Sequence, residues 1–219
     1  MRTIKDYSLY LVITEEYCAG RSAAEIASGA IAGGVDIIQM REKHRSARDS
    51  AKAGAEIAAL CKKAEKLFIV NDDPMLAKVV RADGVHLGKD DLDRFPLEVA
   101  RDIIGRDRII GVSTGSSSDF EKANESDADY IGFGPIFPTK VKTDPIGTAD
   151  IEYIMEIAKK PVFFIGGITL TNIEEVLKLG GRNIALMRGI TEEKDIGSSA
   201  RKFKERLQAQ KDLIKKTGR

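Results

Sequence analysis

Two pairs of adjacent aspartates follow short apolar runs of the sequence and could together bind a metal ion. Asp72 and Asp73 come after the run at 67–70, and Asp90 and Asp91 come after the run at 84–87. Carboxylate oxygens suit Mg²⁺, which takes one or two of them together with phosphate oxygens of a substrate. Asp72 and Asp91 are therefore candidate Mg²⁺ ligands, although an aspartate just before a helix-starting proline also fits an N-cap.

Basic and small polar residues occupy similar places after the other apolar runs. If residues 39–43 continue a strand, alternation puts Gln39, Arg41 and Lys43 on one side. Guanidinium and ammonium groups in such positions can bind phosphate, although a charged surface loop also fits this stretch taken alone. Further candidates at the ends of later runs are Asn71, Ser113, Thr139, Lys142, Gly167, Met187 and Arg188. The whole set indicates a cationic pocket for two phosphorylated groups.

These residues can meet only if the apolar runs are parallel strands of one sheet. Eight continuously apolar runs recur along the chain, as expected of strands buried on both faces, at 8–13, 36–40, 67–70, 84–87, 109–112, 130–133, 162–165 and 183–187. Segments with helical spacing lie between them, at 23–32, 46–65, 74–80, 96–104, 119–125, 151–159, 172–179 and 195–214. This alternation predicts an α/β fold, a (β/α)8 TIM barrel of one domain over residues 1–219 with its last few residues frayed, and a doubly wound open sheet is the alternative.

Composition and missing motifs exclude several classes of protein. With 35 basic and 34 acidic residues the net charge is +1, which disfavours nucleic acid or a membrane surface as the partner. No export signal is evident and the first apolar run is too short to span a bilayer, so we expect a cytoplasmic protein. Cys18 and Cys61 suggest neither a disulfide nor a zinc site, and no Ser-His-Asp set or GxGxxG motif is present. His86 has no evident catalytic partner and is expected to be a hydrogen-bonding residue.

Several ordered motifs recur along the chain, namely Ile38–Lys43 (IQMREK), Asn71–Asp73, Ala82–Asp91 (ADGVHLGKDD), Gly111–Ser113, Ala128–Thr139 (ADYIGFGPIFPT), Lys142 and Pro161–Thr169 (PVFFIGGIT). Together they resemble the motifs of the thiamine phosphate synthase family over nearly the whole chain. The resemblance implies a (β/α)8 barrel that joins hydroxymethylpyrimidine diphosphate to thiazole phosphate, releases diphosphate and forms thiamine phosphate. It also implies small-molecule substrates and a Mg²⁺ cofactor, and it leaves homo-oligomer formation open.

The resemblance further implies a role for each candidate residue. Asp72 and Asp91 would bind Mg²⁺, and Gln39 would lie near the pyrimidine. The diphosphate would be held by Arg41, Lys43, Asn71, Ser113 and Lys142, of which Arg41, Ser113 and Lys142 are the expected catalytic residues, and the thiazole phosphate by Thr139, Gly167, Met187 and Arg188. The reaction would be dissociative: the C–O bond breaks to give a pyrimidine methylene cation, which the thiazole nitrogen captures. Such a mechanism needs stabilisation of charge on the leaving diphosphate and no protein nucleophile.

The sequence departs from the family pattern at four places, and two other functions compete. Lys89 stands where glutamine is usual, Thr114-Gly115 where a histidine often follows the serine, Val141 in place of threonine, and Met187-Arg188 in place of an apolar residue and serine. A thiazole tautomerase-like paralogue would need a general acid or base, for which the loop after the fifth strand offers no histidine. A non-catalytic phosphate-binding barrel is the other alternative, because fold does not establish function.

Overall fold

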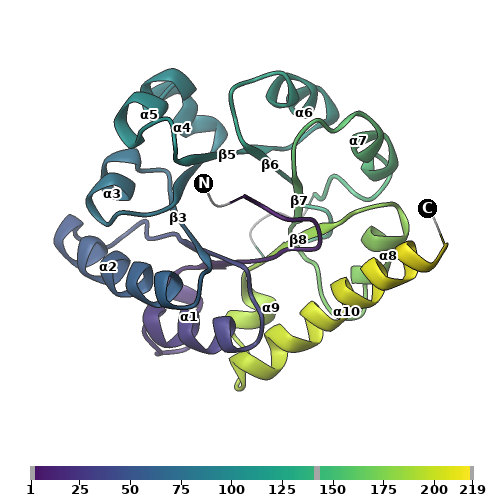
Figure 1. Ribbon diagram of the computed structural model, residues 1–219, viewed down its shortest axis with the longest axis horizontal. Coiled ribbons are helices and arrows are strands. Elements are labelled where there is room, and N and C mark those ends of the chain that lie inside the picture. Colours follow the sequence, from purple (N-terminus) through teal and green to yellow (C-terminus); the bar gives the residue numbers. More distant parts are fainter. Residues whose placement is uncertain (1–2, 141–143, 218–219) are drawn as a thin grey trace.

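Eight parallel strands form a closed barrel in which each strand pairs with the next and β8 pairs with β1 (Figure 1). The computed structural model describes residues 3–140 and 144–217. The strands are β1 (Leu9–Ile13), β2 (Ile37–Met40), β3 (Leu67–Asn71), β4 (Gly84–Leu87), β5 (Ile109–Thr114), β6 (Tyr130–Phe133), β7 (Val162–Ile165) and β8 (Asn183–Leu186). The (β/α)8 barrel expected from the sequence is confirmed, and the open sheet is wrong.

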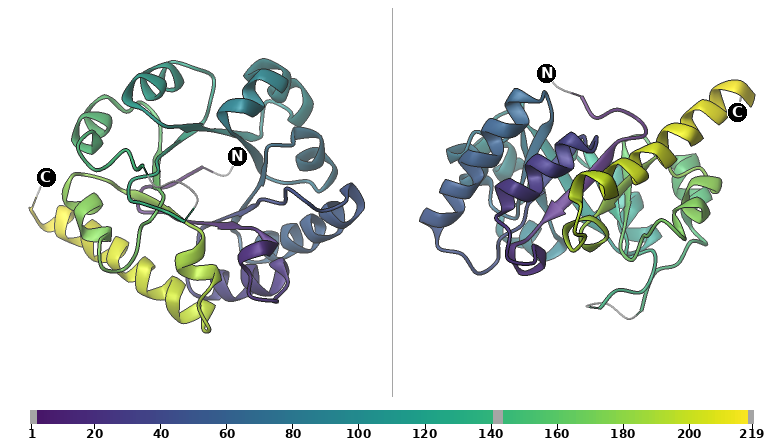
Figure 2. Two further views of the ribbon diagram at one scale, coloured as in Figure 1. Left: turned by 180° about the vertical axis from the view of Figure 1, so that it is seen from behind. Right: turned by 90° about the horizontal axis from the view of Figure 1, so that it is seen from below.

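Helices surround the barrel as an outer ring (Figure 2). They are η1 (Glu15–Tyr17), α1 (Ala23–Ala32), α2 (Ala47–Lys63), α3 (Pro74–Val79), α4 (Lys89–Arg94), α5 (Leu97–Ile104), α6 (Ser117–Asn124), α7 (Ile151–Ile157), α8 (Ile173–Lys178), α9 (Arg188–Thr191) and α10 (Ile196–Thr217). The sequence pattern does not predict η1, α4 and α9. The first and last span only three and four residues, and α4 has Leu92 as its one apolar residue, so helical spacing of apolar residues is not visible in them. The last helix, α10, continues through Thr217, beyond its expected end at 214, and projects past the barrel in Figure 2.

Two apolar layers hold the barrel together. The outer layer lies between the strands and the helices and includes both cysteines, which are buried. The inner layer fills the bore with side chains that include Tyr10, Tyr130 and Phe163, whose rings meet edge to face or tilted with centroids 5.1 to 6.0 Å apart. Tyr130 fits only because Gly111 lies opposite it, where a methyl group would overlap the tyrosine ring. Ile4 packs against this inner layer, and in Figure 1 the N-terminal segment crosses one end of the barrel.

A repeated polar contact fixes the end of the barrel at which the strands begin. Each even-numbered strand starts at or just after an Asp or Asn whose side-chain oxygen accepts a backbone N–H from the start of a neighbouring odd-numbered strand. The pairs are Asp36 with Leu9 (2.9 Å), Asp83 with Phe68 (2.9 Å), Asp129 with Ile110 (2.7 Å) and Asn183 with Ser8 (3.0 Å). Asp36 also binds the Nζ atoms of Lys66 and Lys204 at 3.0 and 2.5 Å, which ties the barrel to α10. These contacts stabilise the fold at the face away from the strand exits.

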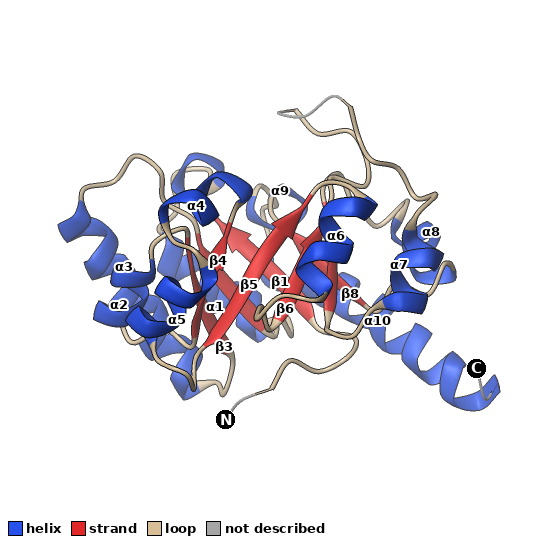
Figure 3. Cartoon of the chain, turned by 90° about the horizontal axis from the view of Figure 1, so that it is seen from above, coloured by secondary structure: helices blue, strands red, loops and turns tan. Residues whose placement is uncertain are grey.

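The opposite face receives the C-terminal ends of the strands. In Figure 3 the strand arrows point towards the side on which α4 and α9 lie, and both short helices start directly after a strand exit. Ligands of parallel barrels bind at this face, so this is where the expected site residues have to be examined. Within the described ranges no helix is both long and apolar enough to cross a membrane.

Candidate active site

A cavity of about 150 Å³ opens at the C-terminal ends of the strands. All eight strands or their exits contribute to its lining, which consists of Tyr10, Val12, Gln39, Arg41, Asn71, His86, Ser113, Tyr130, Gly132, Phe163, Ile165, Ala185 and Met187. Five of these residues, Gln39, Arg41, Asn71, Ser113 and Met187, are expected site residues. The structure therefore brings together side chains that lie far apart in the sequence, and it surrounds them with aromatic rings.

A continuous chain of hydrogen bonds crosses the floor of this cavity. Gln39 Nε2 donates to Tyr10 Oη at 2.8 Å, and Tyr10 Oη lies 2.8 Å from Tyr130 Oη. His86 then connects Tyr130 Oη to Ser113 Oγ, through Nδ1 at 2.9 Å and Nε2 at 2.8 Å. The chain thus runs from the amide of β2 to the hydroxyl of β5. His86 is a hydrogen-bonding residue, as expected from the sequence.

Burial keeps the ionisable members of this chain uncharged near neutral pH. It lowers the pKa of His86 to about 4, and it raises the pKa of Tyr10 well above its usual value against the opposing effect of hydrogen bonds from its neighbours. The pKa of Tyr130 is raised well above its usual value by the same cause. A neutral imidazole has one N–H donor and one acceptor nitrogen, so His86 can pass a hydrogen-bond direction from Tyr130 to Ser113.

The carboxylates of Asp72 and Asp91 lie beside each other at the exits of β3 and β4. Burial and the neighbouring Asp91 carboxylate together raise the pKa of Asp72 to about 6, while Lys43 and Arg41 act in the opposite direction. Gly88 lies next to the pair, because a Cβ atom there would be 2.8 Å from Asp91 Oδ2 and 3.9 Å from Asp72 Oδ1. Two hard-oxygen donors that repel each other next to two cations are suited to a divalent cation shared with an anion.

The local backbone explains why one aspartate of 72–73 reaches the site and the other does not. Asp73 is the N-cap of α3, with its Oδ1 accepting the N–H of Leu76 at 2.9 Å. Asp72 has the left-handed value φ 64°, and its N–H donates to the carbonyl of His86 at 2.8 Å. The N-cap interpretation is therefore correct for Asp73, and Asp72 is left to face Asp91.

These two carboxylates fit a Mg²⁺ ion only as part of its coordination. Among the residues that the structure describes, no group of three or more His, Cys, Asp or Glu side chains is arranged to bind a metal. Mg²⁺ commonly keeps several waters and takes one or two carboxylates plus substrate phosphates, so a two-carboxylate site is adequate when the substrate supplies oxygens. The donor set is thus consistent with a metal that binds together with a phosphorylated ligand.

The loops after β6 and β7 support each other at the far side of the mouth. Gly166 and Gly167 have φ values of 99° and 64°, and a Cβ at Gly167 would lie 2.6 Å from the carbonyl oxygen of Pro138. Only glycine allows this close approach with this backbone geometry. The packing holds the loop that leads to the half-buried Thr139. Lys142 and Val141 lie outside the described residues, so the position expected for Lys142 stays a prediction.

Arg188 begins α9, and its guanidinium is already engaged. It forms two bonds of 2.7 Å, from Nε and Nη2, to Glu192 Oε1, one helical turn further on. Its Cζ also lies 4.7 Å from the centre of the Tyr17 ring. A phosphate bound by Arg188 would have to compete with Glu192. Lys89 is similarly directed towards another acid, with Nζ 3.6 Å from Asp119 on α6.

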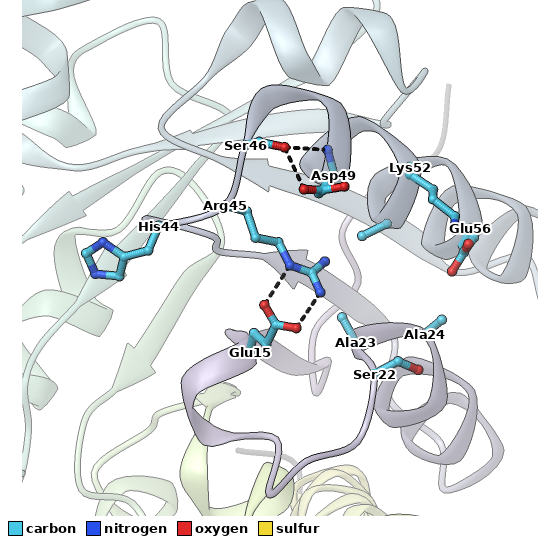
Figure 4. Close-up of a pocket in the computed structure, with 11 residues that line it drawn as sticks. Glu15, Ser22, Ala23, Ala24, His44, Arg45, Ser46, Asp49, Lys52 and Glu56 are labelled. Carbon is cyan, nitrogen blue, oxygen red and sulfur yellow. Dashed lines mark hydrogen bonds and ion pairs between the residues drawn. The ribbon is translucent and has the colours of Figure 1, made fainter.

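A larger hollow of about 480 Å³ lies on the outer flank, between α1, α2 and the loop that follows β2 (Figure 4). Its most prominent contact is the forked ion pair of Arg45 with Glu15, at 2.6 and 2.7 Å. The backbone N–H of Glu15 also donates to Glu42 at 3.2 Å. These contacts hold the loop that carries Arg41 and Lys43 against the segment after β1, so the residues around this hollow stabilise the mouth of the barrel.

Sequence reasoning missed Tyr10, Tyr130, Glu15 and Arg45. Both tyrosines occupy strand positions where a large apolar residue would serve the core equally well, and the sequence contains no signal that their hydroxyls meet. Glu15 and Arg45 are exposed or half-exposed charges in two loops, and such residues usually have no structural partner.

The fold and the mouth define a class of protein: a (β/α)8 barrel whose strand exits carry carboxylates and cations. The family model described as thiamine monophosphate synthase matches residues 9–190. Thiamine-phosphate synthases of Persephonella marina and Halalkalibacterium halodurans are each 40% identical to this chain, over 91% of it and 95% of their own lengths. The solved thiamine phosphate pyrophosphorylase of Pyrococcus furiosus superposes with a TM-score of 0.84 at 33% identity, covering 93% of this chain and 96% of that one. The chain belongs to the thiamine monophosphate synthase family, which confirms the resemblance, and it is an enzyme of that family.

Proposed function

We propose that this enzyme joins hydroxymethylpyrimidine diphosphate to thiazole phosphate, forming thiamine phosphate and releasing diphosphate. The observation that carries the proposal is the arrangement of Asp72 and Asp91 beside Arg41 and Lys43, next to a cavity whose lining, apart from Arg41, is uncharged and includes three aromatic rings. The charged part is complementary to a diphosphate and its metal, and the neutral part to a small flat heterocycle. Membership of the family supports the same reading.

The pyrimidine would occupy the cavity of about 150 Å³ against Gln39. Tyr10 and Tyr130 hold the Gln39 amide in place from below, while the Phe163 ring packs edge to face against both tyrosines. An amide offers one acceptor and two donors, which matches the mixed donor and acceptor edge of an aminopyrimidine. The apolar side chains in the lining would limit water near the carbon that reacts.

The diphosphate would lie between the carboxylate pair and the cations, with Arg41, Lys43, Asn71, Ser113 and Lys142 as its ligands. A Mg²⁺ ion held by Asp72 and Asp91 would neutralise charge on the diphosphate oxygens. Arg41, Ser113 and Lys142 are assigned to stabilise the leaving diphosphate as the C–O bond breaks, because charge develops there and fixed donors require no rearrangement. The Arg45–Glu15 ion pair keeps the loop bearing Arg41 and Lys43 in position.

No protein nucleophile is required in this reaction. The C–O bond electrons leave with the diphosphate, and the resulting pyrimidine methylene cation is captured by the lone pair of the thiazole nitrogen. Within the described residues both cysteines are buried in the outer core, and His86 and Ser113 hydrogen-bond each other without an acid to orient the ring as in a triad. A dissociative path makes binding and charge stabilisation the main tasks of the chain.

The thiazole phosphate is assigned to the opposite side of the mouth. Thr139 in the loop after strand six, the backbone at Gly167 and the segment Met187-Arg188 would bind its phosphate. Barrels of this class often bind phosphate at the loops after strands seven and eight, where Gly167 and Met187-Arg188 lie. Arg188 would reach it by exchanging Glu192 for the phosphate, which offers stronger bidentate acceptors.

The proposal is tested by incubating the pure, folded protein with both phosphorylated substrates and Mg²⁺ and measuring thiamine phosphate. Formation of thiamine phosphate together with equimolar diphosphate, lost on chelation with EDTA, is the expected result. Absence of product from folded protein would refute the synthase function. Asp72→Ala should abolish turnover at low Mg²⁺, with Asp90→Ala as a control on the exposed neighbouring aspartate, and unchanged activity of Asp72→Ala would remove that residue from the metal site.

A further inference from the structure

The hydrogen-bond chain beneath the cavity has two self-consistent directions. In the first direction the Nε2 atom of Gln39 points to Tyr10, as in the structure. Gln39 then donates to Tyr10, Tyr10 to Tyr130, and Tyr130 to His86 Nδ1. His86 then donates through Nε2 to Ser113. If the amide turns over, every donor becomes an acceptor and Ser113 donates back to His86. A mixed arrangement would leave either a buried hydroxyl without an acceptor or the two tyrosine oxygens facing each other with no hydrogen between them, which costs about 1–3 kcal/mol.

The two directions prepare the ends of the chain differently. In the first, Gln39 Oε1 has no partner among the described residues and faces the cavity as an acceptor, and the Ser113 hydroxyl proton is available to an outside acceptor. In the second, the Ser113 proton is used by His86, so Ser113 offers only lone pairs. An anion at Ser113 is stabilised in the first direction and repelled in the second.

We propose that Tyr10, Tyr130 and His86 are positioning residues that couple the two halves of the substrate. An amine that donates to Gln39 Oε1 fixes the chain in its first direction, and Ser113 then donates to the diphosphate. This inference rests on the proposed function, because it takes the pyrimidine to lie at Gln39 and the diphosphate at Ser113. No proton is transferred along the chain; only the hydrogen-bond direction is set.

The coupling between the two binding sites must be reciprocal. Because binding free energies are linked, a diphosphate at Ser113 raises the affinity of an aminopyrimidine at Gln39 by the same factor as the reverse. One neutral hydrogen bond that is gained in the proper direction corresponds to about fivefold in affinity. A ring without the exocyclic amine has no donor for Gln39 Oε1 and should not produce the coupling.

The tautomer of His86 reports the direction directly. The chain contains two histidines, and ¹⁵N-histidine labelling with a His44→Gln variant for assignment separates their ring signals. With 4-amino-2-methylpyrimidine bound, His86 should carry its proton on Nε2, whereas 2-methylpyrimidine should not increase that form. A proton on Nδ1 in the aminopyrimidine complex would overturn the proposal.

Calorimetry measures the coupling itself. In the wild type, inorganic diphosphate with Mg²⁺ should bind about fivefold more tightly when 4-amino-2-methylpyrimidine is saturating. Tyr130→Phe breaks the chain and should reduce this factor to about one, and Tyr10→Phe provides an independent break if the first variant is unstable. Tyr153→Phe removes an exposed tyrosine hydroxyl elsewhere and should leave the factor unchanged.

The outcomes separate the coupling from the proposed function. A protein that forms thiamine phosphate, yet shows the same coupling factor in the wild type, Tyr130→Phe and Tyr10→Phe, would refute the coupling alone. A protein that forms no thiamine phosphate would refute the function on which the coupling rests. A merely structural role for the tyrosines would lower the thermal stability of both variants without changing the ratio of the two diphosphate affinities.

Discussion

Replacing Asp72 by asparagine should stabilise the metal-free protein while it abolishes Mg²⁺-dependent activity. In the folded chain, burial and the Asp91 carboxylate raise the pKa of Asp72 to about 6, from the 3.8 of a free aspartate. This difference corresponds to at most ~3 kcal/mol of destabilisation once Asp72 is ionised. Solvent screening at a half-buried site reduces the figure to ~1–2 kcal/mol. An asparagine of nearly the same shape carries no charge and avoids this cost.

The pH dependence has a definite sign. Below about pH 4 the carboxyl is protonated in both the folded and unfolded chains, and it imposes no charge penalty. Between about pH 4 and pH 6 the unfolded chain ionises first, so the wild type loses stability relative to Asp72→Asn as the pH rises. Above about pH 6 the difference is constant. The advantage of the variant should therefore appear over this interval and then level off.

The assay is thermal unfolding in EDTA, from pH 4 to pH 8, of the wild type, Asp72→Asn and Asp90→Asn. At pH 8 the Asp72→Asn variant should melt about 4 °C higher, and the exposed control should melt with the wild type. Addition of Mg²⁺ with diphosphate should raise the Tm of the wild type and leave that of Asp72→Asn nearly unchanged. If Asp72→Asn melts below the wild type in EDTA at pH 8, the two carboxylates do not repel each other, and the argument for a cation between them fails.

Three further perturbations test other parts of the structure. Asp36→Asn should lower the free energy of unfolding measured in urea by ~1–3 kcal/mol. Although burial raises the pKa of Asp36, the hydrogen bonds it accepts, including those from lysines, outweigh burial and lower that pKa, so the loss should disappear as the pH falls below about 4. A loss that does not depend on pH would contradict the role of the ion pairs. Gly111→Ala should displace the Tyr130 ring and lower the free energy of unfolding by ~1–3 kcal/mol in the same assay. It should also raise the KM for the pyrimidine diphosphate. An unchanged KM would show that the ring can move without affecting substrate binding. Glu192→Gln should remove the ion pair that engages Arg188 and lower the KM for thiazole phosphate a few fold. The KM for the pyrimidine diphosphate should stay unchanged. Equal changes in both KM values would show that Arg188 does not act specifically on thiazole phosphate.

The barrel could be predicted from the sequence because its information is local. A strand buried on both faces has to be continuously apolar, and each such run is followed by a segment with helical spacing, so the alternation is visible in the printed sequence. The position of a polar residue directly after a strand also places it at the mouth of a parallel barrel. For this reason Gln39, Arg41, Asn71 and Ser113 are predicted together, whereas Met187 is added by the family resemblance; all five line the cavity.

The contacts among these side chains depend on the folded structure. The Tyr10 and Tyr130 hydroxyls lie 120 positions apart in the sequence, and they meet because barrel closure directs both rings into one bore. The ion pair between Arg188 and Glu192 depends on the rotamers of both side chains. The left-handed backbone angle of Asp72 determines that Asp72 faces the site while Asp73 caps a helix. A sequence specifies residue type and strand register, whereas hydrogen bonding and charge repulsion depend on distances of a few ångströms, which exist only once the chain has folded.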